Sequence, residues 1–207
     1  MNRFENWFCA TSFWRGITQK QVLPWLLAGT NLGEHVLEVG AGAGAATEEL
    51  RRRASRVTSL EYGQHLAAKL AARSRSGDRN SRAGTSANLG NRYDFVLRGD
   101  ATALPFPSET FSAVLAVLML HHLRSSKAQD LALCESFRVL RPGGLFLALE
   151  IENSWLNRIS HIRSTFVPLS PDEVPARFSA AGFRNISTTK RSGAFRIRAT
   201  RPASAQD

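Results

Sequence analysis

The sequence predicts an α/β protein in which a mostly parallel, doubly wound sheet carries helices on both faces. Two observations predict this fold. A short apolar strand at residues 35–39 is followed by Gly40, Gly42 and Gly44 and then by the start of a helix, which is how a buried parallel strand connects to its crossover helix. Apolar strand-like runs also alternate with amphipathic helical segments along the rest of the chain, which favours a parallel sheet.

Composition limits the class of protein. The 207 residues suit one domain over residues 1–207, and 43% of them are hydrophobic. The longest apolar run, residues 113–120, is too short to span a membrane. We expect no secretory signal at the start of the chain, and Cys9 and Cys134 lack metal-ligand spacing. We therefore expect a cytoplasmic protein, a monomer or homodimer, without a membrane span or a metal site.

The net charge of +10 is unusual, and 23 of the 27 basic residues are arginine. Such a surface can attract nucleic acid, anionic lipid or an acidic substrate. The arginines are scattered along the chain, so a general bias in composition explains the charge equally well.

Residues 1–30 are predicted to be helical and are rich in aromatic side chains. An amphipathic pattern covers residues 15–27, and Pro24 should interrupt that helix. Two interpretations remain open and can both hold. One is a helical layer packed on the sheet, and the other is a lid over a bound cofactor.

The glycine-rich turn predicts a cofactor site. Glycine lets the backbone turn sharply and approach a ligand closely, and the helix that follows, at about residues 45–53, offers free N–H groups. The spacing is G-x-G-x-G, not the G-x-G-x-x-G of dinucleotide-binding folds. An ordinary glycine-rich connection remains the alternative.

Two acidic residues end the neighbouring strands. Glu61 ends a strand at residues 56–61, lies 21 residues after Gly40, and could accept hydrogen bonds from both ribose hydroxyls. Tyr62 could rest against the adenine of a nucleotide-type cofactor. Asp100 follows a strand at residues 93–98 and could accept from the adenine amino group, while the Ala101 N–H donates to a ring nitrogen. The alternatives are a solvated carboxylate for Glu61 and a turn or helix cap for Asp100.

The remaining elements follow in order. We predict helices or strands from the apolar periodicity and from Pro and Gly positions. A polar segment rich in Gly, Ser, Asn and Arg is expected to be a mobile loop. The expected bounds are a helix at 64–73, the loop at 74–91, a strand at 110–118, a helix at 127–140, a strand at 145–150, a helix from Ser170 and Pro171 to 181, and strands at 184–190 and 194–200.

Together these motifs resemble the class I S-adenosylmethionine-dependent methyltransferases, of the small-molecule, methyltransferase-11-like type. The residues that carry the resemblance are the acid-x-G-x-G-x-G pattern at 38–44, Glu61, and the segments 99–101, 111–122 and 140–144. The resemblance implies a Rossmann-like, seven-stranded sheet, S-adenosylmethionine as the cofactor and a small-molecule acceptor. The cofactor-binding residues that it implies are Glu38, Gly40, Ala41, Gly42, Gly44, Glu61, Tyr62, Asp100, Ala101 and Val117.

His121 and His122 follow the predicted central strand. In many small-molecule methyltransferases one or two histidines stand there, and the resemblance makes these two the candidate catalytic residues. Either could orient the acceptor or take its proton, although at least one could be structural.

Two other functions remain as alternatives. The basic surface leaves open an RNA-directed methyltransferase or a nucleic-acid-binding protein on the same fold, although no separate recognition domain is evident. A dinucleotide-dependent oxidoreductase is disfavoured by the glycine spacing.

Overall fold

The computed structural model describes residues 11–81 and 95–204. Its described residues form a seven-stranded sheet in the order β3-β2-β1-β4-β5-β7-β6, in which β7 alone runs against the other strands. The predicted fold class is thereby confirmed. The strands are β1 (His35–Val39), β2 (Arg56–Glu61), β3 (Phe95–Arg98), β4 (Phe111–Val117), β5 (Leu140–Ile151), β6 (Arg184–Arg191) and β7 (Ala194–Thr200).

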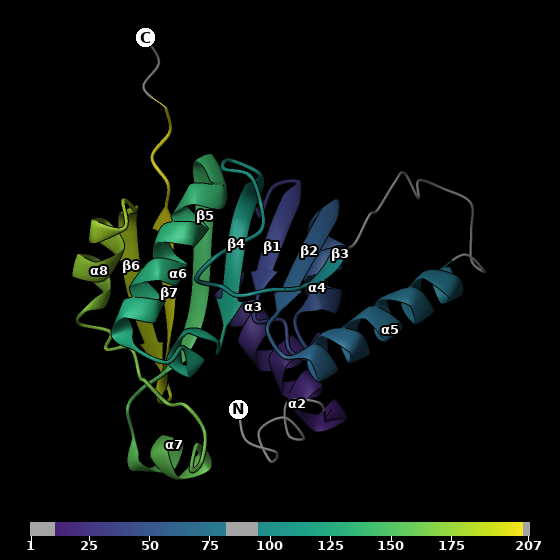
Figure 1. Ribbon diagram of the computed structural model, residues 1–207, viewed down its shortest axis with the longest axis horizontal. Coiled ribbons are helices and arrows are strands. Elements are labelled where there is room, and N and C mark those ends of the chain that lie inside the picture. The colour runs from purple at the N-terminus through teal and green to yellow at the C-terminus, as the bar shows by residue number, and fades with distance from the viewer. Residues whose placement is uncertain (1–10, 82–94, 205–207) are drawn as a thin grey trace.

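Helices cover both faces of this sheet (Figure 1). They are α2 (Ser12–Ile17), the π-helix η1 (Thr18–Val22), α3 (Leu23–Leu26), α4 (Thr47–Arg53), α5 (Gln64–Ser81), the 3₁₀ turn η2 (Leu120–His122), α6 (Ser126–Val139), α7 (Trp155–Ser160) and α8 (Val174–Ala180). None of the described helices is long and apolar enough to cross a bilayer.

Alternation along the central strands divides the core into two layers. On β5, Phe146 packs in a cluster with α6 and α8, whereas Leu147 packs in a second cluster with Leu26 of α3 and Leu50 of α4. Successive side chains of a strand point to opposite faces, so a strand buried on both faces is apolar throughout. The continuous apolar runs of β4 and β5 therefore identify the middle of the sheet.

The register brings the carboxyl ends of the parallel strands to one edge. Val39 pairs with Leu60 of β2 and with Ala116 of β4, and Val117 pairs with Leu149. In open α/β sheets this is the edge at which ligands bind. Figure 1 shows α2 and α7 at the same end of the sheet.

The expected loop after residue 73 is wrong for its first eight residues, because α5 continues to Ser81. At the point of disagreement, the Ser74 hydroxyl donates to the Leu70 carbonyl at 3.0 Å and accepts from Arg51 Nη2 at 2.7 Å. These bonds tie a polar residue into the helix, where its propensity alone favours a turn. Residues 82–91 of the expected loop lie outside the described residues.

The expected start of the last helix at Pro171 is also wrong. The Ser170 hydroxyl accepts from the Asp172 N–H at 3.3 Å, and the Ser170 carbonyl accepts from the Glu173 N–H at 3.1 Å. Together these bonds make a turn, and α8 begins only at Val174. Serine followed by proline favours a turn as well as a helix start, and here the turn forms.

The strand expected at 145–150 begins earlier, at Leu140. Leu140 pairs with Phe111 and Leu145 with Ala113, so the Pro-Gly-Gly segment lies in an irregularity of the pairing. Proline and glycine do end the preceding helix as expected, but the chain then stays beside β4.

The N-terminal segment is helical where it is described. The π-helix η1 ends at Val22, two residues before Pro24, which stands in the first turn of α3, so the interruption falls where proline removes a backbone donor. Leu23 and Leu26 are buried against the sheet, which supports the helical-layer interpretation. Residues 1–10 of the expected lid lie outside the described residues, and the closing of a lid stays a prediction.

Candidate functional site: a glycine turn and a histidine cluster

The glycine turn joins β1 to α4 at the carboxyl edge of the sheet. Gly40, Gly42 and Gly44 all have positive φ, at 74°, 56° and 84°. A side chain at Gly40 would collide with Met119, and a Cβ at Gly44 would lie 2.5 Å from Leu70 Cδ1, whereas a Cβ at Gly42 meets nothing within 4 Å. Packing thus excludes a side chain at Gly40, the positive φ favours glycine at all three positions, and Gly42 lies beside open space.

Glu61 is held against this turn. Its Oε2 atom accepts from the Gly42 N–H and its Oε1 atom from the Gly63 N–H, each at 2.8 Å. The Gly40 and Ala41 N–H groups both donate to the Leu60 carbonyl, at 2.8 and 3.1 Å. The predicted proximity of the glycines and the β2 carboxylate is therefore present, with Glu61 8% exposed.

Glu38 lies beneath the turn and is buried. Its Oε2 atom accepts from the hydroxyls of Thr47 at 2.6 Å and Ser59 at 2.8 Å, which links β1 to the start of α4 and to β2. Burial raises the pKa of Glu38 to about 7, against the lowering effect of these two hydrogen bonds. Glu38 stabilises the turn through these two hydrogen bonds. Its predicted contact with a cofactor stays a prediction.

Asp100 and Ala101 follow β3 at the same edge. The Asp100 Oδ1 atom accepts from the N–H and the hydroxyl of Thr102, at 2.9 and 2.8 Å, so Asp100 does form the turn that was the alternative interpretation. Its Oδ2 atom has no hydrogen-bond donor among the described residues. Tyr62 is exposed and Val117 is partly buried at the end of β4.

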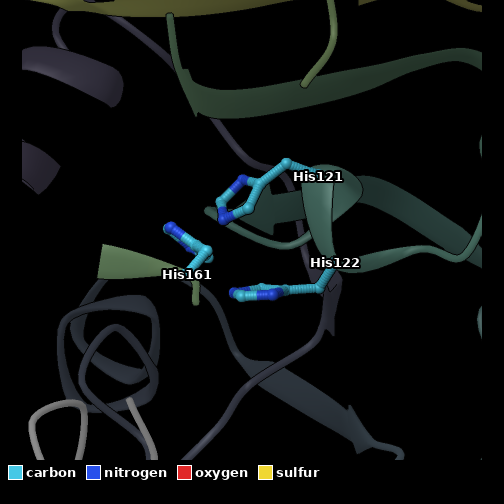
Figure 2. A group of neighbouring side chains, drawn as sticks. All are labelled: His121, His122 and His161. Carbon is cyan, nitrogen blue, oxygen red and sulfur yellow. The ribbon is translucent and has the colours of Figure 1, made fainter. Parts of the chain in front are cut away.

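A cluster of histidines lies next to the glycine turn. Met119, which packs against Gly40, leads directly into η2 with His121 and His122. His161 comes from the residue after α7, and the three imidazole rings converge (Figure 2). Ring centroids are 4.2 Å apart for His121 and His122, 5.2 Å for His121 and His161, and 5.3 Å for His122 and His161.

Each ring of the cluster is oriented through its Nδ1 atom. For His121 this atom lies 2.5 Å from Glu150 Oε2, and for His122 it lies 3.3 Å from the Thr165 carbonyl. For His161 it lies 2.6 Å from the Asn157 carbonyl. An ionised carboxylate and a carbonyl can only accept, so all three neutral rings donate from Nδ1 and carry their lone pair on Nε2.

Burial is uneven within the cluster. His121 is 2% exposed, whereas His122 and His161 are partly buried. Burial lowers the pKa of His122 to about 3, with smaller contributions from the positive charges that His121 and His161 would carry. His122 is therefore a neutral imidazole at physiological pH.

Several residues of this site were not predicted from the sequence. Glu150 fixes His121 and also accepts from the N–H groups of Met119 and Leu120 through Oε1. Gln129 is buried and donates to the carbonyls of Leu120 and Val167, which holds the segment before α8 against η2. An acid at the end of β5, beside β4, is a signal that could have identified Glu150.

Comparison with known families covers the central part of the chain. The family model described as "Methyltransferase domain" matches residues 37–148, more than half of the chain. A demethylmenaquinone methyltransferase from Tropheryma whipplei is 31% identical over 150 residues, which make up 70% of this chain. The chain spans 51% of the length of that relative and 66% of the length of a Haemophilus influenzae relative.

Solved structures share the fold. The methyltransferase solved with the Haloferax volcanii Trm112 methyltransferase activator has a TM-score of 0.73 and 17% identity, covering 98% of this chain and 99% of its own. A SAM-dependent methyltransferase from Thermotoga maritima has a TM-score of 0.69 and 20% identity, covering 97% of this chain and 95% of its own. At these identities the likeness is evidence of the fold alone.

Proposed function

Because this chain belongs to the methyltransferase-domain family, we propose that it transfers a methyl group from S-adenosylmethionine to a small-molecule acceptor. The observation that carries the proposal is the hydrogen bond between Gly42 and Glu61. It joins the open glycine turn to the carboxylate that the ribose hydroxyls require, at the ligand-binding edge of the sheet.

The residues at this edge fit the cofactor. Gly42 leaves room where any side chain would intrude, and Asp100 Oδ2 has no donor among the described residues. The hydroxyl of Thr18 in η1 is buried without a partner within residues 11–81 and 95–204. A buried polar group without a partner is costly, and a polar ligand beneath the N-terminal helices would satisfy it.

The named residues would hold the cofactor and arrange the reaction. When bound, S-adenosylmethionine supplies a methyl group already activated by its sulfonium charge. Glu61 would accept from the ribose hydroxyls, Asp100 and Ala101 would contact the adenine edge, and Gly40 to Gly44 would keep the backbone close to the ligand. The protein then contributes alignment of the acceptor and exclusion of water.

We place the acceptor between the glycine turn and α7. His121 and His122 adjoin this space through Met119, and they remain our candidates for catalytic residues. His121 is the partner of Glu150, which would stabilise a protonated ring, and His122 is the more exposed ring of the pair. The Nε2 lone pairs are the atoms that could accept a hydrogen bond from an acceptor, and with a pKa of about 3 His122 is suited to orienting the acceptor and is a weak base.

The surface around α7 is suited to an apolar acceptor. Trp155, Ile159 and Ile162 are 69%, 54% and 60% exposed beside His161, and exposed apolar groups of this kind often mark ligand or membrane contacts. The Tropheryma whipplei relative is named for a quinone substrate. A quinone-type ring with an apolar tail, in its hydroxyl-bearing reduced (quinol) form, is the acceptor class that fits both observations.

Calorimetric titration with S-adenosylhomocysteine tests the cofactor, and a labelled-methyl transfer screen across quinols, phenols, other metabolites and RNA tests the acceptor. Binding of S-adenosylhomocysteine with one site per chain, together with label in a small apolar acceptor, is the expected result. A failure to bind it at millimolar concentration would refute the proposed cofactor. Label found in RNA alone would refute the proposed acceptor class.

A further inference from the structure

We propose that His121, His122 and His161 form a binding site for a divalent transition-metal ion, with Zn²⁺ as the best-matched ion. One ring nitrogen of each histidine lies within 4.8 Å of those of the other two. Figure 2 shows the three rings gathered around a common region, two from η2 and one from beyond α7. Imidazole is the commonest metal ligand in proteins, and it suits Zn²⁺, Cu²⁺, Fe²⁺ and Ni²⁺.

The distances suit a metal after a small movement. Zn²⁺ binds imidazole nitrogen at about 2.0–2.1 Å, so two ligand nitrogens at tetrahedral angles lie about 3.4 Å apart. Closing three nitrogens from 4.8 Å to this separation moves each by less than about 1 Å. His122 and His161 are only partly buried, which leaves space for a movement of this size.

The hydrogen bonds of the rings are those of metal-binding histidines. A ligating histidine almost always donates its other N–H to a carboxylate or a backbone carbonyl, which fixes the tautomer and the ring orientation. Here Glu150 fills this role for His121, the Thr165 carbonyl for His122 and the Asn157 carbonyl for His161. The three acceptors come from three different segments, and each leaves the Nε2 atom as the donor of electrons to a metal.

Packing holds the third ligand in place. Phe166 stacks on His161 with centroids 4.5 Å apart and an interplanar angle of 25°. The Val167 N–H donates to the His121 carbonyl at 2.8 Å. The Gln129 side chain donates to the carbonyls of Leu120 and Val167. The segment that follows α7 is therefore fastened to η2, so a ring 39 residues further along the chain returns to the histidine pair.

Three protein ligands leave a position open on a tetrahedral ion, which is typical of catalytic zinc sites. An acceptor hydroxyl bound there would lose its proton to solvent more readily, because the ion lowers the pKa of a bound oxygen. The His121 side chain is only 2% exposed, so an ion held by the three rings would offer the acceptor a more accessible partner than this imidazole. The ion would then replace direct proton transfer to an imidazole. This catalytic role rests on the proposed function, whereas the binding site itself does not.

The test is calorimetric titration of the full chain, stripped with a chelator, with ZnCl₂, and spectroscopic titration with CoCl₂. Neither titration contains S-adenosylmethionine or an acceptor. We expect one Zn²⁺ per chain, a tetrahedral Co²⁺ spectrum, and a rise in melting temperature with Zn²⁺. His161→Ala and His122→Ala should each weaken binding by at least about tenfold, while His65→Ala on the surface of α5 and Cys134→Ser should not.

Two further measurements make each outcome decisive. His161 lies outside both core clusters, so His161→Ala is expected to keep its fold and its affinity for S-adenosylhomocysteine. Unchanged Zn²⁺ binding in His161→Ala, or no binding by the unaltered chain, would overturn the metal site. If the unaltered chain still binds S-adenosylhomocysteine in that case, the proposed methyltransferase function stands without the metal. If the unaltered chain binds Zn²⁺ but does not bind S-adenosylhomocysteine, only the proposed function is overturned.

Discussion

The Nδ1 atom of His121 lies 2.5 Å from Oε2 of Glu150, in a pair that is almost completely buried. Glu150 stands near the end of β5 and His121 just after β4, so the pair joins two neighbouring parallel strands at the edge where ligands bind. The other carboxylate oxygen accepts from the Met119 and Leu120 N–H groups. One carboxylate thus sets both the backbone of η2 and the tautomer of His121.

Glu150→Gln should reverse that tautomer. The amide oxygen can keep the bonds from Met119 and Leu120, but the amide NH₂ then faces His121 Nδ1, which must become an acceptor. We expect the imidazole proton to move to Nε2, and the loss of a hydrogen bond to a charged group to cost about 2 kcal/mol of stability. Nitrogen-15 chemical shifts of the imidazole report the tautomer directly. Glu152→Gln, which alters a partly buried carboxylate paired with Lys190, should leave the His121 shifts unchanged.

Gly42→Val should block cofactor binding. A side chain at Gly42 enters the open space of the turn, so we expect the Kd for S-adenosylhomocysteine to rise by at least about tenfold, which is about 1.4 kcal/mol. The positive φ of 56° also costs folding stability, about 1–2 kcal/mol.

Gly193→Val is the matched control for Gly42→Val. Gly193 has a φ of 76°, and an added Cβ there also meets nothing within 4 Å, but it lies in the turn between β6 and β7. Both variants should lose similar stability in thermal unfolding. Equal affinity for S-adenosylhomocysteine in the two variants would contradict the assignment of the turn.

Asp100→Asn should weaken cofactor binding without unfolding the edge of the sheet. The amide oxygen can still accept from the Thr102 N–H and hydroxyl, whereas an NH₂ group in place of Oδ2 would face the adenine amino group. We expect a roughly tenfold rise in the Kd for S-adenosylhomocysteine, about 1–2 kcal/mol, and a melting temperature close to that of the unaltered protein. An unchanged Kd would show that Asp100 only forms its turn.

Glu38→Gln should change the pH dependence of stability. The pKa of Glu38 is about 7 in the folded protein and about 4.5 in the unfolded chain. Between these values the folded state binds the extra proton, so the unaltered protein loses stability as the pH rises from about 4.5 to 7. The variant has no such group and should gain about 3 kcal/mol relative to the unaltered protein over this range.

Urea unfolding at pH 4.5, 6 and 8 measures this difference. Glu49→Gln on α4 should show the opposite pH dependence of stability, because hydrogen bonding from Arg53 lowers the pKa of Glu49. That variant should lose stability relative to the unaltered protein as the pH rises. A Glu38→Gln difference that is flat with pH would mean that Glu38 has the same pKa in the folded protein as in the unfolded chain.

Local sequence determined the strand, turn and helix around Gly40 to Gly44 and the strand-end position of Glu61. Apolar periodicity and glycine placement depend on backbone sterics and on burial of neighbouring residues, so they can be read along the chain. The same reasoning failed after residue 73 and at Pro171. There, side-chain hydrogen bonds at Ser74 and Ser170 decided between helix and turn, two outcomes for which these residues have similar preferences.

Only the tertiary structure decided the composition of the histidine cluster. His121 and His122 are adjacent in the sequence, but Glu150 joins them through the order of strands β4 and β5, and His161 through the return of the chain after α7. The sequence contains five histidines and two cysteines, and the cysteine spacing predicts no metal site. Convergence of side chains from distant segments depends on strand order and packing, which no local pattern encodes.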